Sequence, residues 1–217
     1  MVCVTESWLL PHIDDSIVAL PGYNLIRRDR ESGTGRGGVC LYLRTSYPCK
    51  RLVHCEDRNI ESLWMMLRPC SLPRSVSCII FCVIYHCTAN GEIKNAALRD
   101  HVQTNLDTLL VKHPNALAII TGDFNPTSTG FNVKDLTHAN NIKQMVKFKT
   151  RDSGTLDWFL TNMPNLFDLS QLPKIGASDL FTILARPVTP SLNSRTNRKL
   201  RVRDMRESAW PARLQLV

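Results

Sequence analysis

A carboxylate and a carboxamide stand two residues apart directly after a short apolar run. The run covers residues 116–121, and the turn that follows it reads Gly122-Asp123-Phe124-Asn125. Residues two apart at a strand's end point to the same side of the sheet, so Asp123 can orient a water while Asn125 donates to an oxyanion. A strand followed by an Asp or Asn turn is also common without such chemistry, so ordinary turn formation stays open.

Three more carboxylates flank or interrupt apolar runs. Glu6 ends the first run of the chain, Asp179 precedes the last one, and Asp157 lies inside another. A carboxylate within such a run must be paired, hydrogen-bonded or neutral. Each alone could be an edge charge or a turn cap. As a set with Asp123 and Asn125, they could converge on one sheet edge, where acidic oxygens bind a hard divalent cation such as Mg²⁺.

The elements that must position these side chains are short strands and one long helix. Apolar runs predict strands at residues 2–5, 38–43, 62–67, 77–85, 116–121, 156–160 and 181–185. Most of these runs are continuously apolar, which is typical of strands covered on both faces in a layered α/β sandwich. Helical spacing of apolar residues predicts an amphipathic helix over residues 95–112 and a weaker surface helix over 133–146.

Glycine and cysteine patterns argue against two other kinds of site. The glycines between 33 and 38 precede a strand without the strand-then-helix context of a phosphate-binding loop, so we interpret them as a hairpin or loop. The eight cysteines include no CxxC pair, and several lie inside apolar runs. We therefore expect reduced core thiols, with a disulfide framework or a zinc site as the open alternative.

The net charge of +8 is unevenly distributed. From Arg186 onward there are eight basic residues against two acidic ones, which leaves +6 there and only +2 for the rest of the chain. A polar linker follows Pro187 and leads into a basic segment. This tail predicts a contact with nucleic acid, although a solvated linker would have the same composition.

The sequence contains no run of about 18 apolar residues, the length that a membrane-spanning helix needs. Its first ten residues contain neither a basic region nor a long apolar stretch, and Glu6 interrupts the few apolar residues that are there. We therefore expect no membrane segment and no signal peptide, and an intracellular protein of the nucleus or cytoplasm.

The order of motifs along the chain resembles the endonuclease/exonuclease/phosphatase family. The motifs are TESWL, RRDR with GGV, IESLW, VIYH, TGDFN, TLDWFLTN and finally SD before an apolar run. Within that family they are most similar to the endonuclease domain of non-LTR retrotransposon polyproteins. The resemblance covers nearly all of residues 2–187, and it implies a four-layer α/β sandwich of two mainly antiparallel sheets flanked by helices.

The resemblance also implies a role for each candidate residue. Glu6 matches the family's metal-binding glutamate, and Asp179 matches the aspartate of its terminal SDH motif, at or near the metal, which would be Mg²⁺ or Mn²⁺. Tyr85 matches the tyrosine that contacts the scissile phosphate. Asp123 matches the aspartate that positions or deprotonates the attacking water, Asn125 the asparagine that stabilises the phosphorane, and Asp157 the aspartate that orients the catalytic histidine.

Two departures from the family pattern bear on activity. The terminal motif reads Ser178-Asp179-Leu180, so an alkyl group stands where the family has its histidine. Family members also begin with another strand that carries an active-site asparagine, so we expect an N-terminally truncated sandwich. None of the other histidines considered, His54, His86, His101 and His113, is an obvious replacement, and we interpret them as surface or satisfied side chains.

These observations predict an endonuclease-like domain over residues 1–187 and, over 188–217, a basic connector toward an absent reverse transcriptase. The predicted function is an impaired Mg²⁺-dependent DNA endonuclease acting as a monomer or within a longer polyprotein. The alternative is a non-catalytic remnant that binds nucleic acid through Arg198, Lys199, Arg201 and Arg203. A phosphatase of small phosphoesters would share the same core residues and ranks last.

Overall fold

Aliphatic residues fill the centre of a six-stranded sheet. The computed structural model describes residues 1–30, 36–86, 91–126, 130–152 and 154–188. The sheet has the order β4-β5-β6-β7-β9-β8. Its strands are β4 (Cys49–Arg51), β5 (Glu61–Leu67), β6 (Ile79–Tyr85), β7 (Leu117–Asp123), β8 (Lys143–Gln144) and β9 (Asp157–Thr161). Its central strands are almost entirely buried, which confirms the prediction that continuous apolar runs are covered on both faces.

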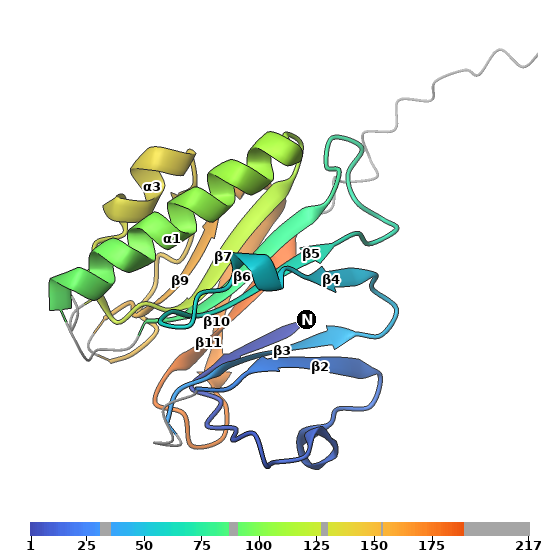
Figure 1. The fold of residues 1–217 in the computed structure, drawn as a ribbon, viewed down its shortest axis with the longest axis vertical. Coiled ribbons are helices and arrows are strands. Elements are labelled where there is room, and N and C mark those ends of the chain that lie inside the picture. The colour runs from blue at the N-terminus through green and yellow to red at the C-terminus, as the bar shows by residue number, and fades with distance from the viewer. Residues whose placement is uncertain (31–35, 87–90, 127–129, 153, 189–217) are drawn as a thin grey trace, which may run out of the picture. The chain divides into compact units, whose positions relative to one another are not determined.

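Helices cover one face of this sheet. The helix α1 (Gly91–Lys112) connects the parallel strands β6 and β7, and α3 (Lys134–Asn140) lies beside it (Figure 1). Leu98, Val102 and Leu106 of α1 pack into the core that this face shares with the helices. The predicted helix over residues 95–112 is therefore confirmed.

The second predicted helix, over residues 133–146, is wrong in its extent. α3 ends at Asn140, and Asn141 adopts a left-handed conformation with φ of 48°. A left-handed residue at this point ends a helix. The chain then enters β8, whose flanking residues Ile142 and Val146 are buried in the two cores on opposite faces of the sheet.

A second layer of strands packs on the other face. It contains β1 (Val2–Thr5), β2 (Tyr23–Arg28) and β3 (Val39–Arg44) in the order β1-β3-β2, and a separate antiparallel pair, β10 (Phe167–Lys174) and β11 (Phe181–Pro187). Val39, Leu41 and Leu43 of β3 contribute to a core with the six-stranded sheet, and Leu169 and Ile183 pack against that core. The protein is thus an α/β sandwich, as predicted.

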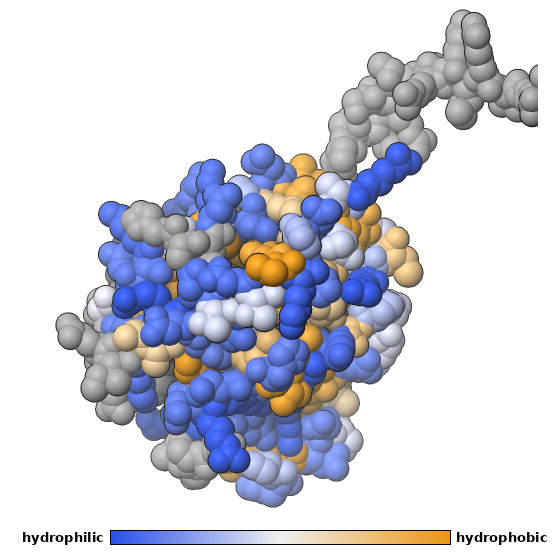
Figure 2. Space-filling view, turned by 45° about the horizontal axis from the view of Figure 1, so that its top comes forward, coloured by the Kyte–Doolittle hydropathy of each residue, from blue (hydrophilic) through white to orange (hydrophobic). Residues whose placement is uncertain are grey.

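On the other side of β3, Cys40 is buried and Tyr42 is half-buried. There the carbonyl of Val18, at the end of the 3-10 turn Asp15–Val18, accepts a hydrogen bond from Tyr42 at 2.8 Å. Short 3-10 turns also occur at Val53–Cys55 and Pro164–Leu166. The face of the molecule in Figure 2 is mainly hydrophilic, with hydrophobic side chains in small groups. No helix of the described chain is long and apolar enough to cross a membrane.

The seven described cysteines are free thiols, as expected, and five of them are buried or half-buried. Cys49 and Cys70 are exposed. Residues Met1–Pro187 form one compact unit. Gly33 and Gly35 of the predicted loop, and Arg198, Lys199, Arg201 and Arg203 of the basic tail, lie outside the described residues.

Candidate active site

Four side chains form one row across the ends of neighbouring strands. In the strand register, Glu61 of β5 lies opposite Tyr85 of β6, Tyr85 opposite Asp123 of β7, and Asp123 opposite Asp157 of β9. Side chains alternate between the faces of a sheet. Leu63, Val83, Ile119 and Phe159, each an even number of residues away, pack in the core under the second layer. The row therefore opens toward β1, β3 and β11, and we call it the acidic row.

Glu6 reaches the acidic row from the second layer. Glu6 is the residue after the end of β1, and its backbone has a φ of 53°. The Oε1 of its side chain accepts a hydrogen bond from the Tyr85 hydroxyl. The backbone N–H groups of Ser7 and Trp8 donate to Gly38 and Gly37 at 3.1 Å and 2.9 Å. The chain therefore turns at Glu6 and holds its carboxylate over the sheet edge.

Glu61 fixes the glycine pair that holds this turn. Its Oε2 accepts the N–H of Gly38 at 2.5 Å, and its Oε1 accepts from the Arg30 guanidinium. Gly37 and Gly38 have φ of 97° and 81°, and a Cβ on Gly37 would lie 2.7 Å from Glu61 Oε2. Arg30 also lies 5.7 Å from the centre of the Tyr85 ring. The same ion pair thus supports both Tyr85 and the turn that bears Glu6.

Asp123 and Asn125 are connected through a tight turn. The N–H of Asn125 donates to Asp123 Oδ1 at 3.0 Å, and its side-chain amide donates to the carbonyl of His86 at 3.2 Å. Asn125 has a φ of 44°, and both residues are buried. The predicted pairing of a carboxylate and a carboxamide at the end of this strand is therefore present.

Asp157 is held by Thr150, which is fully buried. The Thr150 Oγ1 accepts the N–H groups of Leu156 and Asp157 at 2.9 Å and 3.1 Å, and the Thr150 carbonyl accepts from Phe181, the first residue of β11, at 2.7 Å. One threonine thus joins the acidic row to the strand that follows the terminal SD motif. Asp157 Oδ2 is buried and has no hydrogen-bond partner in the described chain.

Asp179 forms an ion pair with Arg151 at the surface. Their side chains are 57% and 43% exposed. Leu180, at the position where the resemblance implies a histidine, is half-buried and offers only its backbone for hydrogen bonding. Its N–H donates to Ser178 Oγ at 3.1 Å. The SD motif therefore brings a carboxylate and a cation to the site but no imidazole.

Electrostatic effects connect these groups. Burial raises the pKa of Asp123 to about 6, the charge of Glu6 raises it further, and the Asn125 hydrogen bonds and Arg151 oppose the rise. Burial also raises the pKa of Asp157 to about 7, and Asp123 and Asp179 add to the shift. The pKa values of Asp123 and Asp157 thus respond to charges from other segments. One electrostatic environment therefore includes these two carboxyl groups and the charges of Glu6, Arg151 and Asp179.

The donor set suits a cation that needs few protein ligands. Within the described ranges, no three His, Cys, Asp or Glu side chains are arranged to hold a metal ion. Mg²⁺, however, keeps several waters and is bound by one or two carboxylates together with substrate phosphate. Glu6 fits this requirement, because it is exposed and its Oε2 has no hydrogen-bond partner in the part of the chain that the structure describes. Asp179 is engaged by Arg151 instead.

The structure adds four residues that sequence reasoning did not assign to the site. Arg30 and Glu61 lie in the RRDR and IESLW motifs, which were recognised only as markers of the family. Thr150 and Arg151 lie in a polar segment before the run 156–160, where no local pattern indicated a role. Only the pairing of distant segments, with Phe181 bound to Thr150, makes their position visible.

Neither His86 nor His101 stands where the resemblance implies an imidazole. His86 follows Tyr85 and points to the other face of the sheet, as predicted; it is buried there, with Nε2 2.7 Å from Asn95 Oδ1. His101 lies on α1, with Nε2 3.0 Å from Ser62 Oγ and 3.1 Å from the Trp64 indole nitrogen. Both are satisfied side chains, and burial lowers the pKa of each.

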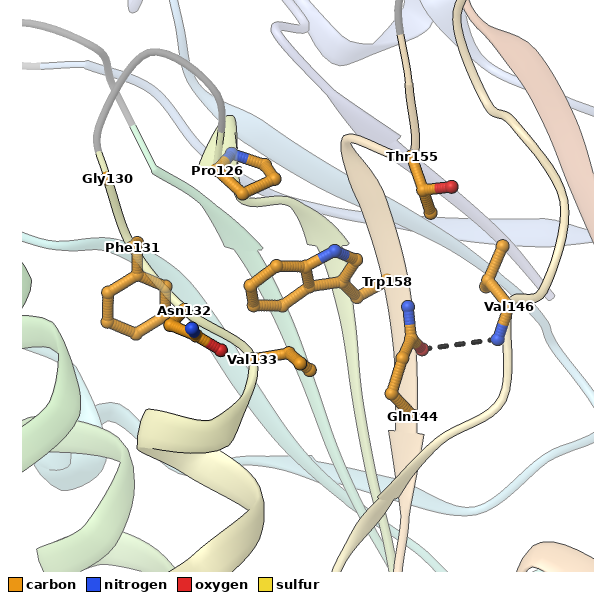
Figure 3. A pocket seen from close by; sticks show the side chains of 9 residues that line it. All are labelled: Pro126, Gly130, Phe131, Asn132, Val133, Gln144, Val146, Thr155 and Trp158. Carbon is orange, nitrogen blue, oxygen red and sulfur yellow. Dashed lines mark hydrogen bonds between the residues drawn. The ribbon is translucent and has the colours of Figure 1, made fainter.

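A cavity of about 500 Å³ is lined by residues that are close in sequence to the acidic row, but it does not lie on the face of the sheet that bears this row. It is lined by Pro126, Gly130, Phe131, Asn132, Val133, Gln144, Val146, Thr155 and Trp158 (Figure 3). Trp158 stacks on Phe124 at 4.5 Å, in the core beneath the helices. Because Trp158 and Asp157 are consecutive on β9, they point to opposite faces. The cavity is therefore separate from the acidic row.

Comparison with known proteins identifies the fold. No family model and no curated protein sequence matches the chain. The human Nocturnin catalytic domain has a TM-score of 0.57 and 15% identity, over 84% of this chain and 78% of that one. Truncated Caenorhabditis elegans TDP2 has a TM-score of 0.55 and 12% identity, over 84% and 82%.

The chain therefore has the endonuclease/exonuclease/phosphatase fold that its motif order predicts. The structures that share it include the endonuclease domain of TRAS1, a telomere-specific non-LTR retrotransposon, with a TM-score of 0.58. That match has 13% identity and covers 76% of this chain and 78% of the other. Identities this low establish the fold alone.

Proposed function

We propose that the chain is a divalent-metal-dependent DNA endonuclease domain of a non-LTR retrotransposon, impaired by the replacement of its catalytic histidine with Leu180. The observation that carries this proposal is the convergence of Glu6, Tyr85, Asp123, Asn125 and Asp157 from four segments onto one sheet edge. Asp123 and Asp157 are neighbouring carboxylates whose pKa values are raised by burial, which is costly to fold, and such groups are concentrated at functional sites.

The residues divide the work of phosphodiester hydrolysis between them. Asp123, with a pKa of about 6, is largely ionised above neutral pH and can orient an attacking water and accept its proton. In this proposal the amide of Asn125 and the hydroxyl of Tyr85 donate to oxygens of the phosphate in the transition state, and Tyr85 exchanges its hydrogen bond to Glu6 for one to phosphate. Glu6 would hold Mg²⁺ or Mn²⁺, which neutralises phosphate charge and activates the attacked phosphorus when bound.

Leu180 explains the expected impairment. As the water oxygen bonds to phosphorus, the 3′ oxygen leaves and takes up a proton, so that a 3′ hydroxyl remains. An alkyl side chain can neither move this proton nor donate a hydrogen bond to phosphate. The unpartnered Oδ2 of Asp157 is the group that would orient an imidazole at this place.

The test is a plasmid-nicking assay with Mg²⁺ on the natural chain and on Leu180→His. We expect slow or no nicking by the natural chain and a gain of about 10² or more in Leu180→His, since general acid–base catalysis contributes that much. Asp123→Asn in the Leu180→His background should abolish the gain. Leu180→Gln serves as the matched polar control.

Failure of every form to nick, including Leu180→His with an added N-terminal strand, would reject the endonuclease if circular dichroism shows the proteins folded. The second candidate, a non-catalytic remnant that binds nucleic acid through its basic tail, would then remain. Leu180 itself is the observation that favours it. Its binding should depend steeply on salt and disappear when the chain from Arg186 onward is removed.

A further inference from the structure

A basic cleft lies at the end of the sheet away from the acidic row. Its volume is about 500 Å³, and it lies between the edge strand β4, the end of β5 and the last turn of α1. Glu61 begins β5 in the acidic row, whereas Arg68 follows its end. With about 3.3 Å per residue along a strand, the two places are about 20 Å apart. The cleft is therefore a separate feature of the molecule.

The charges of this cleft are of one sign. Lys50, Arg68 and Lys112 contribute fixed positive charges, His54 and His113 line it as well, and no Asp or Glu is among its lining residues. Among the residues that the structure describes, none of the three cations forms an ion pair. Lys112 also balances the negative end of the α1 dipole, but Lys50 and Arg68 have no such role.

The backbone brings these cations together in a defined way. Lys50 lies opposite Met66 in the register of β4 and β5, and the N–H of Arg68 donates to the carbonyl of Pro48 at 3.0 Å. Two exposed basic side chains are thus held on neighbouring segments of the chain, where a bound anion would interact favourably with both.

The floor of the cleft is apolar. Leu52 and Leu109 are buried beneath it, and Met66 is half-buried. A ligand that suits such a cleft combines a negative group with a flat or apolar part. A volume of about 500 Å³ is within the range of small-molecule sites, and a rigid duplex would not enter it.

We propose that this cleft binds a nucleoside phosphate, as one unit of a single-stranded nucleic acid or as the free nucleotide. The phosphate lies between Lys50, Arg68 and Lys112, and the base rests on the apolar floor. In such sites the cations supply salt-dependent affinity, and the contact with the base is independent of sequence. This site is distinct from the acidic row and does not depend on its chemistry.

Two exposed thiols allow a direct test on the full chain. Cys49 lines the cleft, whereas Cys70 is exposed and is not among its lining residues. The rate of iodoacetamide alkylation at each is measured by mass spectrometry in EDTA, with and without a single-stranded oligothymidylate. We expect several-fold slower alkylation of Cys49 and an unchanged rate at Cys70. Equal protection of both thiols, or of neither, overturns the proposal.

Charge-reversal variants identify the cations that bind. Lys50→Glu and Arg68→Glu should remove the protection of Cys49, and each should reduce the salt slope of oligonucleotide binding by about 1. Lys143→Glu, exposed on the opposite edge strand β8, is the matched control. If Lys143→Glu has the same effect as Lys50→Glu, affinity comes from net charge and the cleft is not a site.

Two further probes separate the sources of the phosphate. Protection by adenosine monophosphate as well as by the oligonucleotide assigns the free nucleotide, and protection by the oligonucleotide alone assigns a strand. Protection by anionic phospholipid vesicles but by neither nucleotide probe overturns the proposal in favour of a lipid surface. Because these measurements need no cleavage, their result is independent of whether the chain nicks DNA.

Discussion

Asp157 is the residue whose surroundings differ most from the requirements of a carboxylate. It is largely buried, one oxygen has no partner in the described chain, and the neighbouring charges of Asp123 and Asp179 are of the same sign. All three conditions favour the neutral acid. Its pKa of about 7 therefore makes the stability of the fold depend on pH.

The sign of this dependence follows from the direction of the shift. Below the ordinary value of 3.8, Asp157 is protonated in the folded and unfolded states alike. Between about 4 and about 7 only the folded state keeps the proton, so the free energy of unfolding falls as pH rises through this window. The raised pKa of Asp123, about 6, acts in the same direction.

Asp157→Asn should therefore stabilise the protein at pH 8 and not at pH 4. The shift alone corresponds to about 4 kcal/mol at 1.36 kcal/mol per pKa unit, and an unpartnered amide costs about 1–3 kcal/mol, so we expect a net gain of about 1–3 kcal/mol. Urea unfolding across this pH range measures it. Asp152→Asn, at an exposed side chain, is the control and should change little; equal effects at both pH values would contradict the argument.

At the scale of elements, the parallel pairing of β6 with β7 holds Tyr85 and Asp123 side by side. Gly122 lies opposite Ile84 in this pairing, with a φ of 141°. A Cβ at this position would lie 1.8 Å from the carbonyl oxygen of Ile84, a backbone atom that cannot yield without parting the strands. The glycine of the GDFN motif is thus required by the sheet and not by the chemistry.

Gly122→Ala should consequently destabilise the protein by more than about 4 kcal/mol, in the range of severe single substitutions. Thermal unfolding followed by circular dichroism measures the loss. Gly154→Ala places its Cβ in open space and should change the free energy of unfolding by less than about 0.5 kcal/mol. A mild effect of Gly122→Ala would show that β6 and β7 can separate locally at low cost.

At the scale of the whole molecule, both cores lie within residues 1–187. We propose that the basic segment from residue 188 onward is a connector that contributes affinity for nucleic acid and nothing to the fold. Its charge predicts counterion release on binding, with a slope of about 0.9 per phosphate contact for duplex DNA.

Deletion of residues 188–217 should leave the unfolding midpoint unchanged and make the dependence of DNA affinity on salt shallower. Fluorescence anisotropy at several salt concentrations, beside denaturant unfolding, checks both. The binding of single-stranded DNA that remains is expected to weaken further in Lys50→Glu. A large fall in stability on deletion would show instead that the segment belongs to the folded domain.

Local sequence determined much of this protein. Continuous apolar runs predicted the buried strands, and helical spacing predicted α1. Carboxylates that flank or interrupt apolar runs predicted Asp123 and Asp157 along one edge of the sheet. These features follow from periodicity and burial, which a single sequence carries. β2 and β10 were not predicted because they are half-exposed and polar, and their pairing with β3 and β11 forms them.

Only the tertiary structure decided which charges meet. Nothing near Thr150 or Arg151 in the sequence indicates that one supports Asp157 and the other binds Asp179, because both contacts depend on how β11 is placed against the 150–155 turn. The basic cleft likewise joins three cations that are far apart in the chain. Periodicity records which face a residue buries, whereas electrostatic neighbours depend on register and strand order, which the whole sheet sets.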